Sequence, residues 1–325
     1  MGLSILQKFR IMLPLGVLSL VFFFGACGVF DKDLEQDKHI AAFRHQMLVT
    51  LDSLKNPEDR IRNLDSIISR INSDDALITE RKKNIVLKEC YSFISSEYCD
   101  LKNYTKAIEI CNISLSIDSS DAGGYFSRGV AYQGRGDVEK ALADYDKAIS
   151  INDNYTDAYY NRGVLYDNLE NYEDALKDYT KAIKQNPSYI VDIYLNRGNV
   201  YQKMDEKEKA LEDYNQTLKL DSLYVAAYSN RGNIYTGIGE YEMAVTDYTK
   251  AIQLDSLDAD AYNKRGFVYE LRRDYEQAER DYKETIKLDP KNAKGLKAKG
   301  QDGLDRLKIA KRLLKEIHRK NKSKK

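Results

Sequence analysis

Residues 191–224 read VDIYLNRGNVYQKMDEKEKALEDYNQTLKLDSLY, and residues 225–258 read VAAYSNRGNIYTGIGEYEMAVTDYTKAIQLDSLD. Both segments carry an Arg-Gly pair at their seventh and eighth positions. The pair occurs five times, at spacings of 34, 35, 34 and 34 residues: Arg128-Gly129, Arg162-Gly163, Arg197-Gly198, Arg231-Gly232 and Arg265-Gly266. A period this regular indicates an array of similar structural units.

Aromatic and small residues recur in phase with this pair. Tyrosine occupies positions 4, 11 and 24 of all five segments, and alanine occupies position 20. Positions 4, 8 and 11 lie on one face of a helix, and positions 20, 24, 27 and 28 lie on one face of a second helix. A glycine inside a helix costs up to about 1 kcal/mol. Its recurrence at position 8 therefore indicates that the two helices pack closely.

This pattern resembles the tetratricopeptide repeat (TPR), a 34-residue helix-turn-helix unit. The resemblance implies an all-α, right-handed TPR solenoid with six such repeats and helical caps at both ends. The predicted repeats are 88–121, 122–155, 156–189, 191–224, 225–258 and 259–292. The first of them is weaker, because Ser95 replaces the glycine and Cys111 replaces the second-helix tyrosine.

The two ends of the array are predicted to be covered, because an open solenoid end exposes an apolar face. Residues 39–87 contain apolar stripes at helical spacing and are predicted to form divergent capping helices. Residues 293–325 are predicted to form a closing amphipathic helix with a basic tail.

Charge and composition argue against several classes of function. The chain has 325 residues, with 51 Lys and Arg against 51 Asp and Glu, so no overall field attracts nucleic acid. His39, His45 and His318 lie outside the repeats and lack metal-ligand spacing. No phosphate-binding loop or nucleophile motif is present. We expect a protein that is not an enzyme, with no cofactor, no metal, no nucleic-acid partner and no small-molecule substrate.

The N-terminus resembles a bacterial lipoprotein signal peptide. Lys8 and Arg10 precede an apolar run at residues 11–24, and Gly25-Ala26 precedes Cys27. Charged, apolar and small-residue segments in this order are typical of export signals. The resemblance implies that residues 1–26 are removed and that Cys27 carries a lipid.

A lipid on Cys27 would leave residues 27–38 as an acidic tether to the membrane. The implied location is the bacterial cell envelope, lipid-anchored and facing the periplasm or the surface, with the outer membrane favoured. The alternative is an anchor that is never cleaved, because residues 11–30 are uncharged and about long enough to span a bilayer.

The remaining cysteines are Cys90, Cys99 and Cys111. Cys90 and Cys99 are nine residues apart on one predicted helix, about 13 Å of helical rise, which is too far for a disulfide. Cys111 stands at a core position and is predicted to be a small buried hydrophobic residue. We therefore expect free thiols, although exported proteins often form disulfides.

Arginine at position 7 and aspartate at position 23 occur together in five repeats. The aspartates are Asp144, Asp178, Asp213, Asp247 and Asp281. The weak repeat lacks both partners and has Ile94 and Ile110 instead. Joint presence and joint absence predict an ion pair, either within a repeat or between neighbouring repeats.

In the TPR family, positions 2, 5, 6, 9, 12 and 13 line a concave groove that binds extended peptides. Tyr160, at position 5, is the one tyrosine outside the packing positions and is predicted to be an exposed anchor. Asparagine can both donate to and accept from a peptide backbone. The asparagines predicted to bind peptide are Asn161, Asn196 and Asn230 at position 6, and Asn199 and Asn233 at position 9.

The sequence thus predicts a protein-protein interaction scaffold that binds a protein or peptide partner in its groove. A TPR subgroup that clamps C-terminal carboxylates has lysine at positions 2 and 5, and these lysines are missing here. The alternative is a structural subunit of an envelope complex that uses its convex face or basic tail, with no peptide in a merely hydrated groove. Residues 306–325 hold ten Lys or Arg and one Glu, which fits either a solvated cap or a contact with an anionic partner or membrane.

Overall fold

The computed structural model describes residues 38–73, 80–291 and 295–322. These ranges form fifteen α-helices and no strand. The predicted signal peptide, the lipidated Cys27 and nearly all of the tether lie outside the described residues. None of the helices in the described ranges combines the length and the apolar character needed to cross a bilayer.

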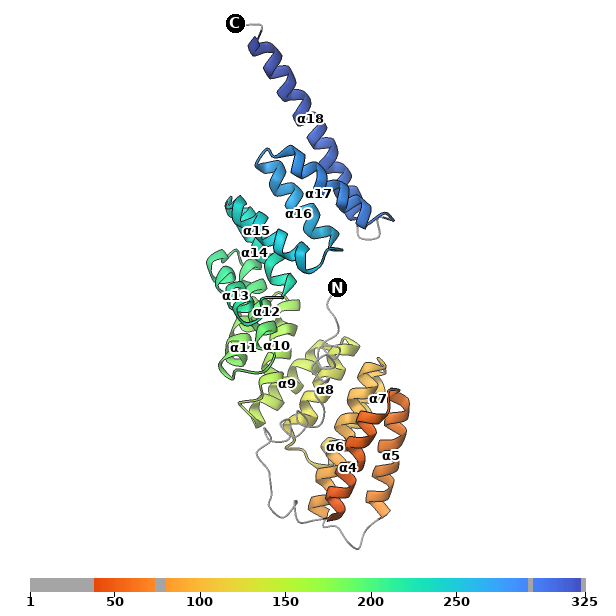
Figure 1. Cartoon of the computed structure of the whole chain (residues 1–325). Helices are drawn as coiled ribbons and strands as arrows, with labels where there is room; N and C mark the ends of the chain where they lie inside the picture. The colour runs from red at the N-terminus through yellow and green to blue at the C-terminus, as the bar shows by residue number, and fades with distance from the viewer. Residues whose placement is uncertain (1–37, 74–79, 292–294, 323–325) are drawn as a thin grey trace. The chain divides into compact units, whose positions relative to one another are not determined.

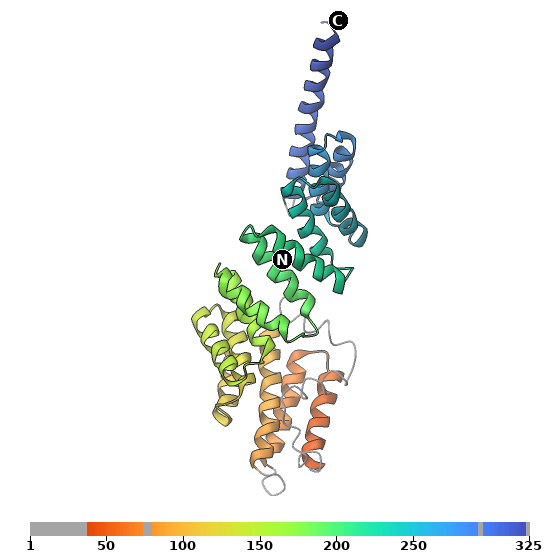
Figure 2. The ribbon, with the colours of Figure 1, turned by 90° about the vertical axis from the view of Figure 1, so that its left-hand side faces the viewer.

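The chain divides into two compact units, one ending at Leu165 and the other beginning at Tyr166, so the division falls within α10 (Thr156–Asn168). The described helices that lie wholly in the first unit are α4 (Lys38–Ser53), α5 (Pro57–Ser73), α6 (Glu80–Asp100), α7 (Tyr104–Ile117), α8 (Ala122–Arg135) and α9 (Val138–Ile151). Those in the second are α11 (Tyr172–Lys184), α12 (Ile190–Lys203), α13 (Lys207–Leu220), α14 (Val225–Ile238), α15 (Tyr241–Leu254), α16 (Ala259–Leu271), α17 (Tyr275–Leu288) and α18 (Leu296–Lys322). Within each unit, consecutive helices pack side by side (Figures 1 and 2).

One turn geometry joins the two helices of each repeat. At position 15 the backbone enters the left-handed region, which favours glycine. The residues there are Lys102, Gly136, Glu170, Asp205, Gly239 and Arg273. The amide of the next residue donates to the carbonyl of Tyr at position 11, for example from Asn103 to Tyr98 at 2.7 Å, as in a Schellman turn. The weak repeat 88–121 therefore has the same turn as the others.

Glycine at position 8 lets the tyrosine at position 24 lie against the first helix. Tyr214 is fully buried, and a Cβ added at Gly198 would stand 2.8 Å from its Cε1 atom. The same approach occurs between Gly129 and Tyr145, Gly232 and Tyr248, and Gly266 and Tyr282. The close packing predicted from the recurring glycine is thus confirmed.

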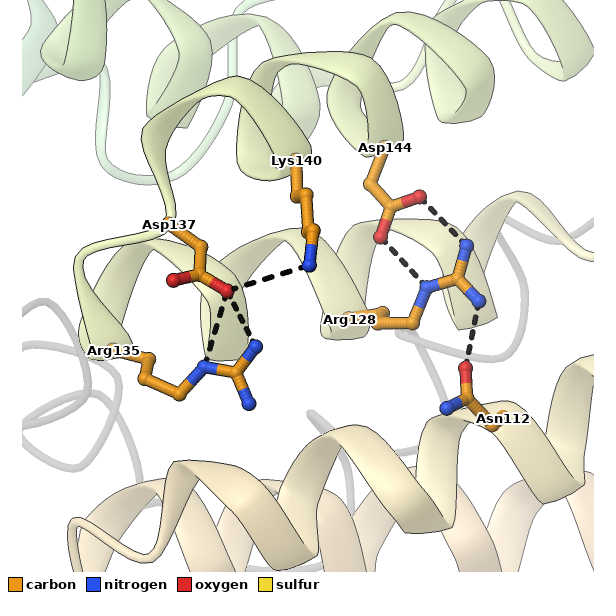
Figure 3. A network of polar contacts seen from close by, with 6 residues as sticks. All are labelled: Asn112, Arg128, Arg135, Asp137, Lys140 and Asp144. Atoms are coloured by element: carbon orange, nitrogen blue, oxygen red, sulfur yellow. Dashed lines mark hydrogen bonds and ion pairs between the residues drawn. The ribbon is translucent and has the colours of Figure 1, made fainter.

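The arginine at position 7 contacts two repeats at once. Arg128 on α8 donates from Nε and Nη2 to both carboxylate oxygens of Asp144 on α9, each at 2.8 Å, and from Nη1 to Asn112 Oδ1 on α7 at 2.8 Å (Figure 3). The hydrogen bond to Asp144 raises the pKa of Arg128. The predicted pair therefore forms within the repeat, and the same guanidinium also bonds to the preceding repeat.

The same arrangement recurs in the second unit. Arg197, Arg231 and Arg265 form bidentate bonds with Asp213, Asp247 and Asp281, and donate from Nη1 to Thr180, Asn215 and Thr249 of the preceding repeat. Every one of these three guanidinium groups also lies over two tyrosine rings, at positions 4 and 11. These contacts join neighbouring repeats through side chains as well as through the helix stack.

The N-terminal helices share an apolar core with the weak repeat. Phe43 and Met47 on α4 and Leu64 on α5 pack with Ile94 on α6. The helix α6 runs without a break across residue 88, where the sequence pattern placed the boundary between cap and repeat.

The three cysteines of the described residues are free, as expected. Burial raises the pKa of Cys90 and Cys99 to about 12 and that of Cys111 to about 11. Such thiols stay protonated and unreactive at neutral pH.

The long helix α18 covers the last repeat. Leu307 is buried with Tyr282, and Gly303 lies directly against the ring of that tyrosine. Arg306 donates from Nε and Nη2 to the carboxylate of Glu270 on α16, both at 2.9 Å. Burial alone would raise the pKa of Glu270, but hydrogen bonds from Arg306 and Tyr282 lower it.

Candidate functional site

The first helix of a repeat is buried on two faces, which leaves a defined accessible arc between them. In α12, Ile193 and Val200 are buried on one face, and Leu195 and Gly198 on another. At 3.6 residues per turn, positions 2, 6, 9 and 13 lie together between these faces.

We call the residues at these positions of the second unit the 2-6-9-13 surface. They are Asp192, Asn196, Asn199 and Lys203 of α12, Ala226, Asn230, Asn233 and Gly237 of α14, and Asp260, Lys264, Phe267 and Leu271 of α16. All of them are half-buried or exposed.

The expectation that Tyr160 is exposed is wrong. Tyr160 is 9 % exposed, because position 5 lies one turn before the glycine at position 8, on a packed face of the first helix. Leu195, at position 5 of the next repeat, is buried. Phe126, at position 5 of repeat 122–155, packs against an apolar cluster that contains Tyr145. Asn161 is 1 % exposed, and its Nδ2 donates to the carbonyl of Asp157 at 2.9 Å. Both residues lie in the first unit and do not belong to the 2-6-9-13 surface.

The four other predicted asparagines do belong to this surface, and the core orients two of them. Tyr214 and Asn230 Nδ2 both donate to Asn199 Oδ1, each at 2.8 Å, and Tyr248 donates to Asn233 Oδ1 at 2.9 Å. Burial raises the pKa of Tyr248 to about 12, so its hydroxyl stays a donor at neutral pH. Because each Oδ1 accepts from the core, the Nδ2 groups of Asn199 and Asn233 are left to donate outward.

Two apolar residues on this surface were not predicted from the sequence. Phe267 at position 9 and Leu271 at position 13 are each 41 % exposed on α16, one turn apart. Phe267 is the only aromatic residue at position 9 of the six repeats, and this feature of the sequence could have indicated it. The tyrosines alone do not.

Charged groups of the surface are largely paired. Lys264 Nζ lies 2.8 Å from Asp260 Oδ2, and Lys203 Nζ lies 2.7 Å from Asp167 Oδ1. The arrangement therefore offers fixed amide donors beside an apolar patch, without a strong local field. Among the described residues, no three His, Cys, Asp or Glu side chains lie close enough to hold a metal ion.

Comparison with known families identifies the repeated unit. A family model described as tetratricopeptide repeat matches residues 156–189, 191–222 and 259–292. The chain carries tetratricopeptide repeats. A second model, described as TPR repeat, matches residues 134–169 and 232–271. No curated protein matches the sequence.

Solved TPR structures share the repeated helical arrangement of this chain. The C-terminal part of a TPR repeat-containing protein from Cytophaga hutchinsonii has a TM-score of 0.59 at 19 % identity, over 81 % of this chain and 99 % of that one. YrrB, described as a TPR protein with an unusual peptide-binding site, has a TM-score of 0.51 at 24 % identity, over 58 % and 97 %. PilW, a type IV pilus biogenesis factor, has a TM-score of 0.55 at 18 % identity, over 62 % and 94 %. These likenesses show that the fold is an all-helical TPR solenoid.

Proposed function

We propose that this TPR protein is an interaction scaffold of the bacterial cell envelope that binds a polypeptide segment on its 2-6-9-13 surface. The observation that carries the proposal is the pair of core-oriented amides, Asn199 and Asn233, at position 9 of successive repeats, with the exposed Phe267 at the same position of the repeat that follows. The chain carries tetratricopeptide repeats, and one solved structure of this fold is described as having a peptide-binding site.

The ligand best suited to this surface is an extended segment with an apolar side chain. Each outward Nδ2 donates to a backbone carbonyl of the segment, and such bonds are independent of sequence. Phe267 and Leu271 bury an apolar side chain of the ligand, which supplies most of the affinity. Because neighbouring charges are paired, a strongly charged segment gains little here.

Replacing Phe267 by alanine is expected to weaken peptide binding by about 2 kcal/mol, or about 30-fold, because it removes the apolar anchor. Peptides selected from a random display library on the full chain serve as probes. Their dissociation constants are then measured for the wild type and for Phe267→Ala. The melting temperature should hardly change, since the side chain is exposed.

Leu257→Ala is the matched control, because Leu257 is an even more exposed apolar residue that lies outside the surface. Equal affinity of the wild type and Phe267→Ala would rule out this surface as the binding site. Equal losses in both variants would show that the selected peptides bind any exposed apolar group.

The envelope location rests on the sequence of the N-terminus and has its own test. In cells given a fatty-acid probe, the wild-type chain should be labelled, and Cys27→Ser should lose the label and accumulate with residues 1–26 attached. Retention of the label in Cys27→Ser, or a mature N-terminus at another residue, would contradict lipidation at Cys27.

A further inference from the structure

The helix α18 begins as the first helix of another repeat but does not end as one. Gly300 follows Gly266 by 34 residues, and a Cβ there would stand 3.0 Å from the carbonyl oxygen of Tyr282. The first helices of the complete repeats end after 13 or 14 residues, whereas α18 continues for 27. With Gly300 at position 8, the turn of a repeat would fall at residue 307. We call the part of α18 after residue 307 the extension.

The extension leaves the stack of helices. Figures 1 and 2 both show the C-terminal half of α18, in dark blue, continuing past α16 and α17. Lys311 still reaches the repeat, with its Nζ 2.6 Å from Glu279 on α17. The hydrogen bonds from Lys283 and Lys311 lower the pKa of Glu279 to about 2, so its carboxylate is charged at neutral pH.

A second apolar stripe lies on the extension, away from the repeats. Ile309 is 61 % exposed and Leu313, one turn later, is 53 % exposed. Ile309 is two residues after the buried Leu307, which places it about 200° around the helix. The helix is thus apolar on a face that packs against no helix of the second unit.

The extension is strongly basic, with Glu316 as its one acidic residue. Glu316 pairs with Arg312, and Asp305, which precedes the extension, pairs with Lys308. Lys315 is exposed and adds a further positive charge. By sequence, residues 317–325 contribute five more Lys or Arg and no acidic residue. A second copy of α18 is an unfavourable partner for this face, because like charges would meet.

We propose that the extension of α18 binds the surface of an anionic phospholipid bilayer, independently of the peptide surface proposed above. A helix with Lys and Arg on one side and Ile and Leu on another lies in the headgroup region, with its apolar side chains below the charges. Each basic residue near an anionic bilayer strengthens binding about 5-fold. The lipid predicted on Cys27 would hold the chain beside a bilayer, which favours lipid headgroups over an acidic protein as the anion source.

Vesicle binding of the full chain tests this proposal. Sedimentation is compared on vesicles of phosphatidylcholine with and without phosphatidylglycerol, at low and high salt. The N-terminal apolar segment binds both kinds of vesicle alike, so the readout is the preference for phosphatidylglycerol. The wild type is expected to show a clear preference that salt weakens.

Two sets of variants locate the contact. Changing Arg312, Lys315, Arg319 and Lys320 to Gln is expected to reduce the preference about 600-fold, at about 5-fold for each residue. A control set with the same change in net charge substitutes four exposed lysines elsewhere, Lys55, Lys147, Lys219 and Lys291, and should keep most of the preference. Ile309→Ser with Leu313→Ser is expected to reduce binding about 10-fold, whereas Leu223→Ser with Leu257→Ser should not.

Circular dichroism melting of each variant shows that the repeats remain folded. Three results would overturn the proposal: no preference for phosphatidylglycerol in the wild type, equal losses in the two charge sets, or an unchanged preference after loss of Ile309 and Leu313. If the wild type shows no preference, an acidic protein partner replaces the bilayer as the occupant of this face.

Discussion

Tyr214→Ala is expected to lower the free energy of unfolding by about 4 kcal/mol, since removal of a fully buried aromatic side chain costs 3–5 kcal/mol. The ring packs in one buried cluster with Leu195, Ala210 and Ile234. Tyr214→Phe should cost only about 1 kcal/mol, the value of the one hydrogen bond that its hydroxyl shares between Asn199 and Gln202. Urea unfolding followed by circular dichroism measures both, with the whole array fitted repeat by repeat because such arrays need not unfold in one step.

A second substitution shows whether the ring is the reason for the glycine at position 8. In the wild type, Gly198→Ala is expected to destabilise, because its Cβ would stand 2.8 Å from the ring of Tyr214. In the Tyr214→Ala background the same substitution should stabilise by up to about 1 kcal/mol, since alanine favours the helix over glycine. If Gly198→Ala has the same sign in both backgrounds, the glycine has another cause.

The packing positions of the repeat could be predicted because the same residue type recurs at each of them. Glycine at position 8, alanine at position 20 and tyrosine at position 24 recur together, and each type fits only a narrow range of packing distances. Their agreement over five repeats specifies both helices and the face on which they meet. The ion pair could be predicted in the same way, because its arginine and its aspartate are both present in five repeats and both absent from the weak one.

The turn and the cap boundary could not be predicted in this way. Position 15 requires a left-handed backbone, yet four of the six described turns place Lys, Glu, Asp or Arg there, so glycine does not mark it. These residues cost about 1 kcal/mol more than glycine in such a conformation, which the packing of the two helices outweighs. The helix α6 similarly crosses residue 88 because nothing between Glu80 and Asp100 breaks a helix.

The candidate site was predicted only in part, because exposure depends on what packs against a helix from both sides. The resemblance to the TPR family assigned position 5 to the groove, and Tyr160 is the one tyrosine outside the packing positions, so the sequence predicted its exposure. The structure buries a second face, and Tyr160 with it. Position 9 lies between the two faces, so Asn199, Asn233 and Phe267 remain accessible.

Arg197→Ile is expected to lower the free energy of unfolding by about 3 kcal/mol. This is the second largest effect that we predict. Asp213 is 2 % exposed in its side chain and would keep a buried charge without its bidentate partner. The substitution also removes the hydrogen bond from Arg197 to Thr180 and the contacts of the guanidinium with the rings of Tyr194 and Tyr201. Unfolding in urea at neutral pH gives the value.

The weak repeat supplies the matching double variant. There Ile94 and Ile110 occupy the positions of the arginine and the aspartate, and Ile94 is buried in the N-terminal core. Two packed apolar side chains can replace a buried ion pair at little cost. Arg197→Ile with Asp213→Ile should therefore be within about 1 kcal/mol of the wild type, and more stable than Arg197→Ile alone.

Recovery in the double variant would mean that the ion pair contributes little net stability and instead fixes how neighbouring repeats are placed, through the guanidinium that touches both. Amide hydrogen exchange tests this second part. Exchange in α11 and α12 should be faster in the double variant than in the wild type, because the bond from Arg197 to Thr180 between these helices is lost. If the double variant is at least as unstable as the sum of its single variants, the pair contributes no coupling energy, and its arginine and aspartate act separately.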